Sequence, residues 1–252
     1  YQVWDAFHDW AARSRSGVML TQHKLVIDLA MQNMDKPIHF STTVGMSNFM
    51  GLEKYMVQEG MIYDFQKGDL TVRRGDFDAV RTANLIDSVY KFRGLGDGTA
   101  FVNSETLRLL SSYISLYLQI SFDAREKITA IRSEKPYTIA RKAQVDALAL
   151  NAIKFLEIGM FQFPDEWRNY WAAAYVYEAA GMKQPALDVL ARGLKHVPAY
   201  DEGGRSRLAM SLKSIEQMPD EPPAIEPETP ASDSSAKDSA TDSTAVVASA
   251  GK

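Results

Sequence analysis

The sequence of 252 residues contains no cysteine. It therefore cannot form a disulfide scaffold, a thiolate zinc site or a cysteine nucleophile. It also contains no run approaching the roughly 18 apolar residues of a membrane span, and it shows no signal peptide. What remains is an ordinary globular composition, with 46% hydrophobic and 24% charged residues. The length is sufficient for one large or two small domains with a buried core.

Net charge is nearly absent from most of the chain. The formal net charge is −4, but residues 219–252 carry seven acidic residues against Lys237 and Lys252, which leaves +1 on residues 1–218. The same segment holds five of the ten prolines and no aromatic residue. Because such a segment cannot bury enough apolar surface to offset its ordering entropy, we predict a disordered acidic tail at 219–252. It is either an acidic interaction arm or, as composition favours, a solvated terminus. The remainder has no basic cluster, which argues against a nucleic-acid partner.

The beginning of the chain predicts a mixed α+β region. Apolar residues recur at helical spacing over residues 1–15, and Thr21 is placed to cap a second helix. The inward residues expected for this second helix are Leu25, Val26, Leu29 and Ala30. The chain also begins without a methionine, which we interpret as a sign that it was cut from something longer.

A small sheet is predicted next. Residues 38–44 and 61–65 have the β-branched and aromatic content of strands, and a short helix is expected over 52–58, ending at Gly60. The spacing allows parallel or antiparallel pairing of the strands. A moderately helical segment at 77–92 and a glycine-rich turn at 94–98 follow.

The second half is helical in pattern and contains a repeat. A long helix is capped by Asn103 or Ser104, and further on Gly159 and Gly193 lie 34 residues apart, as do Pro164 and Pro198. A 34-residue period is typical of tetratricopeptide helical hairpins. We count one good repeat at 165–198, flanked by degenerate helices at about 138–163 and 202–217. Since about three such units are needed for an independent solenoid, this half is expected to pack against the first half.

The predicted fold class is therefore mainly α. An N-terminal α+β subdomain with a small sheet is expected at 1–127, tetratricopeptide-like helical hairpins at 128–218, and the acidic tail at 219–252. None of the four histidines, His8, His23, His39 and His196, has the spacing of a paired metal ligand on a helix, so no metal or cofactor is predicted. We also assign no catalytic residue.

Two polar segments stand out in the first half. They are the strand end at Phe40–Thr43 and the glycine-bounded segment at 51–60. Polar residues that follow a strand can form a ligand-binding edge, but they can equally satisfy backbone groups where the strand ends. We favour the structural interpretation and keep the ligand-binding one open.

Five strings in this half resemble one family. They are KPIHFSTTV at 36–44, NFMGLEKY at 48–55, QEGMIY at 58–63, YKFRGL at 90–95 and NSETLRLLSSY at 103–113. They resemble the protein O-mannosyltransferase-like multi-pass membrane proteins, a family catalogued as a domain of unknown function and common in Bacteroidetes. In that family, a membrane region similar to lipid-linked-sugar-dependent glycosyltransferases precedes a soluble extracytoplasmic domain that often ends in tetratricopeptide-like helices. The resemblance covers about residues 20–125 through specific strings. Residues 138–217 resemble the family only in their general type, as tetratricopeptide-like helices.

The resemblance implies a location and a role. The chain would be a non-catalytic extracytoplasmic (periplasmic) domain, tethered through a missing N-terminal membrane region, and the catalytic acidic residue would lie in that region. Its partners would be its own membrane-embedded domain and an acceptor protein or peptide, which it would help to position. The residues expected on the shared-motif surface are Phe40, Ser41, Thr42, Thr43, Gly51, Leu52, Tyr55, Gln58, Glu59, Gly60, Phe92, Arg93 and Gly94.

An alternative function needs no link to glycosylation. The helical half would be a tetratricopeptide-type protein-interaction module with a peptide groove. The candidate groove residues are Trp167, Tyr170, Tyr175 and Tyr177. Aromatic residues at these positions are more often part of the repeat core, so we keep both interpretations.

Overall fold

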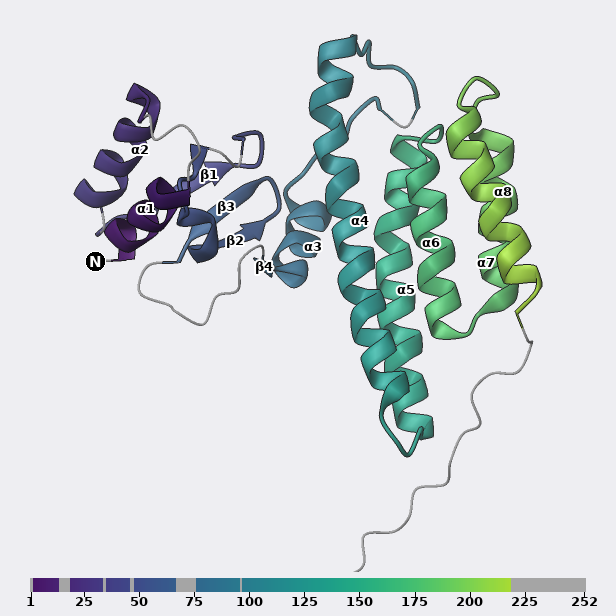
Figure 1. Cartoon of the computed structure of the whole chain (residues 1–252). Helices are drawn as coiled ribbons and strands as arrows, with labels where there is room; N and C mark the ends of the chain where they lie inside the picture. The colour runs from purple at the N-terminus through teal and green to yellow at the C-terminus, as the bar shows by residue number, and fades with distance from the viewer. Residues whose placement is uncertain are drawn as a thin grey trace, which may run out of the picture.

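The computed structural model describes residues 2–13, 19–33, 35–45, 48–66, 76–95 and 97–218 (Figure 1). The described residues form eight α-helices and a small sheet, which confirms the predicted mainly-α fold class. The acidic tail predicted at 219–252 lies outside the described residues. No helix among the described residues is long and apolar enough to cross a membrane.

The N-terminal region combines two helices with the sheet. Its elements are α1 (Gln2–Arg13), α2 (Thr21–Gln32), β1 (His39–Ser41), the 3-10 helix η2 (Leu52–Tyr55), β2 (Met56–Glu59), β3 (Ile62–Phe65) and β4 (Asp76–Phe77). The strand order is β1-β3-β2-β4. β3 pairs antiparallel with both β1 and β2, and β4 runs parallel to β2. The pairing that the sequence left open is therefore antiparallel for the two predicted strands.

The prediction of a helix over residues 52–58 is wrong beyond the first turn. The chain makes one 3-10 turn at η2 and then continues as β2, with Met56 and Gln58 buried and Val57 and Glu59 half-buried. This alternation fits a strand with one covered face. Gly60, at a φ of 59°, provides the positive φ of the tight turn into β3, so it ends a strand rather than a helix.

The inward face predicted for α2 is also partly wrong. The helix buries His23, Ile27 and Ala30, whereas Leu25 and Leu29 are exposed. The His23 ring packs edge-on against Trp10 of α1, with ring centroids 5.1 Å apart. This aromatic contact between the two helices accompanies a rotation of α2 that turns the leucines outward.

A small cluster of buried side chains holds this region together. Phe49 is fully buried at its centre and packs edge-on against Phe40 and Tyr63. Gly51, at a φ of 87°, brings the backbone against the Ala6 carbonyl of α1, where a Cβ atom would collide with that oxygen. α1 is thereby fixed directly on the chain that leads into β2.

The rest of the chain is a stack of helices. These are α3 (Ala79–Ser88), α4 (Ser104–Ser133), α5 (Ile139–Gln162), α6 (Trp167–Ala180), α7 (Lys183–His196) and α8 (Glu202–Glu216). The hairpin predicted at 165–198 is confirmed as α6 and α7, which meet at Gly181 with a φ of 78°. The predicted cap of the long helix is Asn103, whose side chain accepts a hydrogen bond from the Thr106 amide.

The helices alternate in direction, so that α4, α6 and α8 share one orientation (Figure 1). α6 packs against both α4 and α8, while α5 and α7 complete the hairpins. The boundary predicted at residues 127/128 falls inside α4. The buried side chains divide the chain earlier, with one cluster ending at Phe65 and the other beginning at Ile86.

Candidate functional site

The residues of the predicted motif surface lie at the sheet and at its junction with the helices. Leu52, Tyr55 and Gln58 are buried, as is the backbone of Gly60. Gly51 and Glu59 are half-buried. These residues therefore face the interior more than the solvent. Leu52 and Tyr55 belong to the buried cluster of the N-terminal region, whereas Gln58, Glu59 and Gly60 contact α3 and α4.

The polar strand end at Phe40–Thr43 caps its own backbone. The Ser41 and Thr43 hydroxyls lie 2.8 Å apart, and the Thr43 amide donates to the Ser41 hydroxyl. The Thr42 amide donates to the Met61 carbonyl, while the buried Thr42 hydroxyl has no hydrogen-bond partner. The Phe40 ring packs on Phe49. Most of these contacts stabilise the turn that follows β1.

The third part of the predicted motif is a turn beside α4. The Phe92 ring packs edge-on against Tyr90 and Tyr113, and Arg93 is exposed. Gly94 has a φ of 80° and accepts a hydrogen bond from the Ala100 amide. This confirms the predicted turn.

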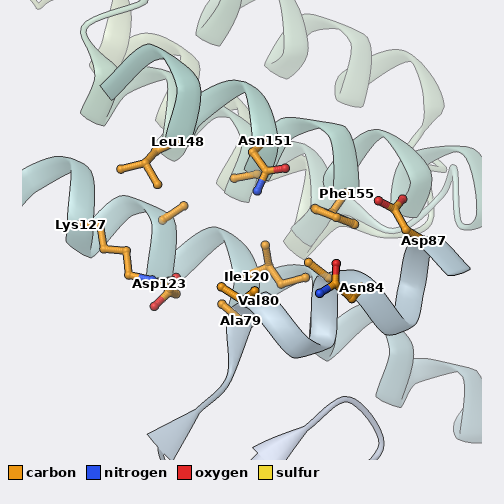
Figure 2. A pocket seen from close by; sticks show the side chains of 13 residues that line it. Ala79, Val80, Asn84, Asp87, Ile120, Asp123, Lys127, Leu148, Asn151 and Phe155 are labelled. Carbon is orange, nitrogen blue, oxygen red and sulfur yellow. Dashed lines mark hydrogen bonds and ion pairs between the residues drawn. The ribbon is translucent and has the colours of Figure 1, made fainter. Parts of the chain in front are cut away.

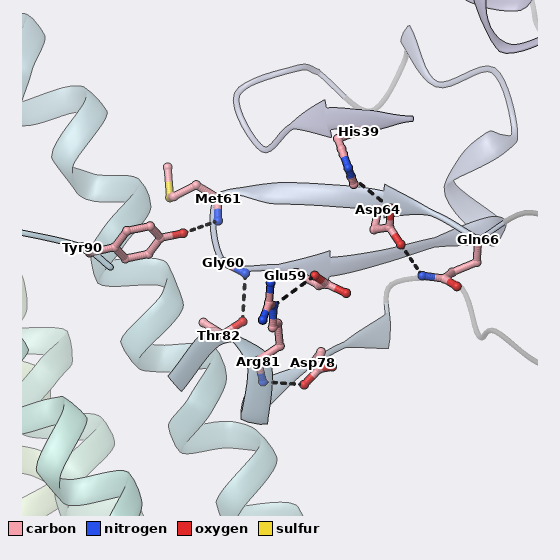
Figure 3. A network of polar contacts seen from close by, with 10 residues as sticks. All are labelled: His39, Glu59, Gly60, Met61, Asp64, Gln66, Asp78, Arg81, Thr82 and Tyr90. Carbon is pink, nitrogen blue, oxygen red and sulfur yellow. Dashed lines mark hydrogen bonds and ion pairs between the residues drawn. The ribbon is translucent and has the colours of Figure 1, made fainter. Parts of the chain in front are cut away.

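The tip of the β2–β3 hairpin is anchored to the helical stack by hydrogen bonds (Figure 3). The Gly60 amide donates to the Thr82 hydroxyl of α3 at 2.9 Å, and the Met61 amide donates to the Tyr90 hydroxyl at 3.1 Å. The Gln58 side chain donates to the Gly60 carbonyl and accepts from Gln119 of α4. We call this set of contacts the joint. It places the sheet relative to α3 and α4, and it leaves no space for a side chain at Gly60.

A histidine–carboxylate pair lies on the outer part of the sheet. His39 of β1 and Asp64 of β3 are cross-strand partners, and their side chains approach to 3.0 Å (Figure 3). The side-chain Nε2 of Gln66 also donates a hydrogen bond to the Asp64 carboxylate at 2.5 Å. No group of three or more metal-ligating side chains occurs among the described residues. The pair acts here as a cross-strand contact.

A cavity of about 220 Å³ opens between α3, α4 and α5 (Figure 2). Its inner wall is apolar and includes Ile120, Ala124 and Phe155. Both carboxylates of its lining are held by lysines, Asp123 by Lys127 at 2.7 Å and Asp87 by Lys154 at 2.5 Å. Because both carboxylates are paired with lysines, the cavity is a weak candidate for a reactive site.

The four aromatic residues predicted to form a peptide groove are divided by the structure. Trp167 and Tyr175 are half-buried on one side of α6. Tyr170 is only 2% exposed, donates its hydroxyl to the Pro164 carbonyl, and belongs to the core. Tyr177 is half-buried and packs against the same core, as Trp167 also does. Burial raises the pKa of both Tyr170 and Tyr177 above the ordinary value.

Trp167 and Tyr175 belong to a larger set that the sequence did not single out. Trp171 lies between them on α6, with centroids 6.2 Å from Trp167 and 4.4 Å from Tyr175. Phe122 of α4, which is 47% exposed, packs edge-on against Trp171 at 6.3 Å. The spacing of four residues from Trp167 to Trp171 to Tyr175 places them on one helical face and was the signal available in the sequence.

Two arginines flank these rings. Arg125 of α4 lies 5.2 Å from the centroid of the Tyr175 ring, and Arg207 of α8 lies 5.2 Å from that of the Trp167 ring. Such cation–π contacts hold a guanidinium group beside an aromatic ring. We call Phe122, Trp167, Trp171 and Tyr175, with these two arginines, the aromatic face. It joins three helices that are far apart in the sequence.

A groove of about 430 Å³ adjoins the aromatic face. It is lined by Arg125, Thr129, Arg132, Ser133, Glu178, Ala179 and Met218. Arg125 belongs to both features, and Arg132 donates to the Ala179 carbonyl at the end of α6. The aromatic face and the groove together form an aromatic and cationic surface over α4, α6 and α8.

No protein-family model, curated protein sequence or solved structure matches this chain. The functional argument therefore starts from the chain's own side chains. Of the features described, the cavity has both carboxylates paired with lysines, and the joint has its backbone amides bonded to Thr82 and Tyr90. The aromatic face and the groove, in contrast, combine the exposed ring of Phe122 and the half-buried rings of Trp167, Trp171 and Tyr175 with arginine side chains from α4 and α8.

Proposed function

We propose that the chain is a non-catalytic protein-binding module, which holds a peptide segment of a partner protein on the aromatic face. The single observation that carries this proposal is the set of four aromatic rings on α4 and α6 with arginines from α4 and α8 over two of them. Tryptophan, tyrosine and arginine are the residues most enriched at the energetic centres of protein interfaces.

The position of these residues supports binding of an extended segment. Trp167, Trp171 and Tyr175 follow one another along α6, and Phe122 extends the row onto α4. Rigid aromatic side chains offer a large contact area and lose little conformational entropy when they bind. Helical hairpins that stack side by side are well suited to present such a row.

The family resemblance supplies a more specific version of this proposal. In that version the module lies on the periplasmic face of the membrane, tethered to a membrane-embedded glycosyltransferase region, and it positions acceptor protein for glycosylation. Its support is the five sequence strings at 36–44, 48–55, 58–63, 90–95 and 103–113. The alternative is an interaction module without any link to glycosylation. The aromatic face supports both versions equally.

The test is a double variant, Trp171→Ala with Tyr175→Ala. A displayed library of random twelve-residue peptides is selected on the full chain, and the affinity of the enriched peptides is measured by fluorescence anisotropy. We expect the double variant to bind them at least tenfold more weakly, since removing a central aromatic residue commonly costs about 2 kcal/mol or more. The matched control is Phe161→Ala, an exposed aromatic of α5 outside the aromatic face.

Two results would count against the proposal. One is equal binding by the double variant and the control, and the other is enrichment of peptides that bind elsewhere. The same variant, introduced into the natural gene product in its own cells, separates the two versions. The glycosyltransferase version expects reduced glycosylation of acceptor proteins with unchanged hydrolysis of the donor lipid. Unchanged glycosylation, with peptide binding lost, supports the module that is unrelated to glycosylation.

A further inference from the structure

We propose that the aromatic face and the groove are occupied, in the resting protein, by the acidic proline-containing segment 219–230 of the same chain. This inference rests on the proposed function, because the segment would occupy the surface that a partner peptide uses. A partner would then have to displace it, and would share its acidic and proline-rich chemistry. Three observations carry the inference: the place where the segment starts, its charge, and its proline content.

The segment starts at the edge of the groove. α8 ends at Glu216, and Met218, the last described residue, lines the groove opposite residues of α4 and α6. The Lys183 ammonium of α7 donates to the Met218 carbonyl at 2.6 Å. The described part of the chain therefore ends at the groove.

The charge of the segment is complementary to that of the surface. Residues 219–230 contain Asp220, Glu221, Glu226 and Glu228 and no lysine or arginine. The surface presents Arg125, Arg132 and Arg207, and Glu178 is the carboxylate in the groove lining. Carboxylates and guanidinium groups form strong charge-assisted hydrogen bonds, so the segment and the surface are complementary in the sign of their charge.

The prolines of the segment suit an aromatic surface. Five of its twelve residues are proline: Pro219, Pro222, Pro223, Pro227 and Pro230. Proline-rich segments favour the extended polyproline II conformation, which docks on aromatic-lined grooves with little loss of entropy.

The reach of the segment is sufficient. Twelve residues span roughly 37 Å in the polyproline II conformation. The row from Trp167 to Tyr175 extends about 12 Å along α6. Intramolecular attachment also provides an effective concentration on the order of millimolar, so even weak contacts populate the bound state.

The absence of cysteine makes a direct test simple. A single cysteine introduced as Ala224→Cys in the full chain is labelled with a nitroxide, and broadening of the four tryptophan indole N–H signals is measured by NMR. We expect strong broadening for Trp167 and Trp171, and little for Trp4 and Trp10 in α1. The matched control is the same label at Ala248→Cys, near the end of the chain, which should broaden these signals less.

Charge swaps show whether the arginines hold the segment. Arg125→Glu with Arg207→Glu should abolish the selective broadening, and adding Glu221→Lys with Glu226→Lys should restore it. If the arginines had only a structural role, the lysine substitutions in the segment would not restore the selective broadening. Raising NaCl to about 0.5 M, where the Debye length is only roughly 4 Å, should also reduce the broadening. Equal broadening of all four tryptophans, or selective broadening that the charge swaps leave unchanged, would overturn the inference.

Mixed samples distinguish binding within one chain from binding between chains. Isotope-labelled chain without cysteine is mixed with nitroxide-labelled chain of natural isotope content, and selective broadening in this mixture would also overturn the inference. The outcome is separable from that of the proposed function. If selected peptides bind the aromatic face but the label at residue 224 has no effect, only the inference fails. If the label broadens Trp167 and Trp171 but no peptide in solution binds there, the partner-binding proposal fails instead.

Discussion

The N-terminal region and the helical stack achieve order in different ways. In the stack, long helices with side-chain caps such as Asn103, Thr138 and Asp201 are connected by short loops, so each helix packs on neighbours close in the sequence. In the N-terminal region, strands of two to four residues depend on partners that lie farther along the chain, as when β2 pairs with β4. Such short strands are marginal alone and need tertiary support.

The support comes from the joint. The hairpin between β2 and β3 donates backbone hydrogen bonds to Thr82 and Tyr90, both of which belong to the segment that leads into α4. The dependence should therefore be one-sided. Damage to the helical stack should destabilise the sheet, whereas damage to the joint should release the sheet and leave the stack folded.

The largest expected effect comes from the core of the stack. Leu190 of α7 is fully buried, and Leu190→Ala should destabilise the protein by about 2 to 5 kcal/mol, because it leaves a cavity among packed helices. Urea unfolding measures the loss, and hydrogen exchange should show reduced protection in the sheet as well as in α4–α8. Leu150→Ala, at an exposed position of α5, is the control and should change stability by less than about 0.5 kcal/mol. A sheet that kept its protection would contradict the one-sided dependence.

A smaller effect is expected at the joint, where Gly60 can be compared with Gly98, a glycine of the 94–98 turn outside the joint. Gly60 and Gly98 have φ angles of 59° and 68°, but a Cβ atom at Gly60 would collide with Tyr90 and Leu85, while one at Gly98 would meet nothing within 4 Å. Gly98→Ala should cost about 1 to 2 kcal/mol from backbone strain alone. Gly60→Ala adds overpacking, for about 2 to 4 kcal/mol in total.

Hydrogen exchange decides whether Gly60 acts through the joint. In Gly60→Ala, amides of β1–β3 should exchange faster while those of α5–α7 keep their protection. An equal loss of unfolding free energy in the two alanine variants would show that the close approach of Gly60 to Tyr90 does not contribute to stability. Uniform loss of protection over the whole chain would show that the sheet and the stack unfold as one unit.

The same contrast explains which features were predictable from the sequence. The α6–α7 hairpin followed from the 34-residue spacing, and the start of α4 from its capping residue, because both signals are local. β2 was missed because residues 52–58 also suit a helix, and only pairing with β3 makes them a strand. The rotation of α2 depends on the contact of His23 with Trp10 of another helix, which no periodicity within α2 contains.

The candidate site was predictable only in part for a related reason. Trp167 and Tyr175 were selected, but Tyr170, three residues after Trp167, proved to be core. Phe122 and Arg207 come from α4 and α8, and only the packing of these helices against α6 brings them to the tryptophans. A surface assembled from three helices has no single sequence signature.

The smallest expected effect concerns a buried hydroxyl that links two helices of the stack. Tyr117 of α4 is fully buried and donates to the Gln162 side chain of α5 at 2.7 Å. Burial raises the pKa of Tyr117 well above its ordinary value of about 10. Since the folded state disfavours the ionised ring, its contribution to stability is complete below about pH 10 and is lost as pH rises further. We therefore expect the free energy of unfolding to decline above pH 10.

Tyr117→Phe tests this directly. At neutral pH the variant should lose about 1 to 2 kcal/mol, because the Gln162 oxygen is left buried without its donor. Above pH 10 its stability should decline less steeply than that of the parent, although Tyr113 and Tyr170, whose pKa values are also raised by burial, keep part of the decline. Urea unfolding between pH 8 and about pH 11 measures both effects, with the exposed Tyr200→Phe as control. Identical pH slopes in Tyr117→Phe and Tyr200→Phe would mean that the tyrosine between α4 and α5 does not set the alkaline limit of the stack.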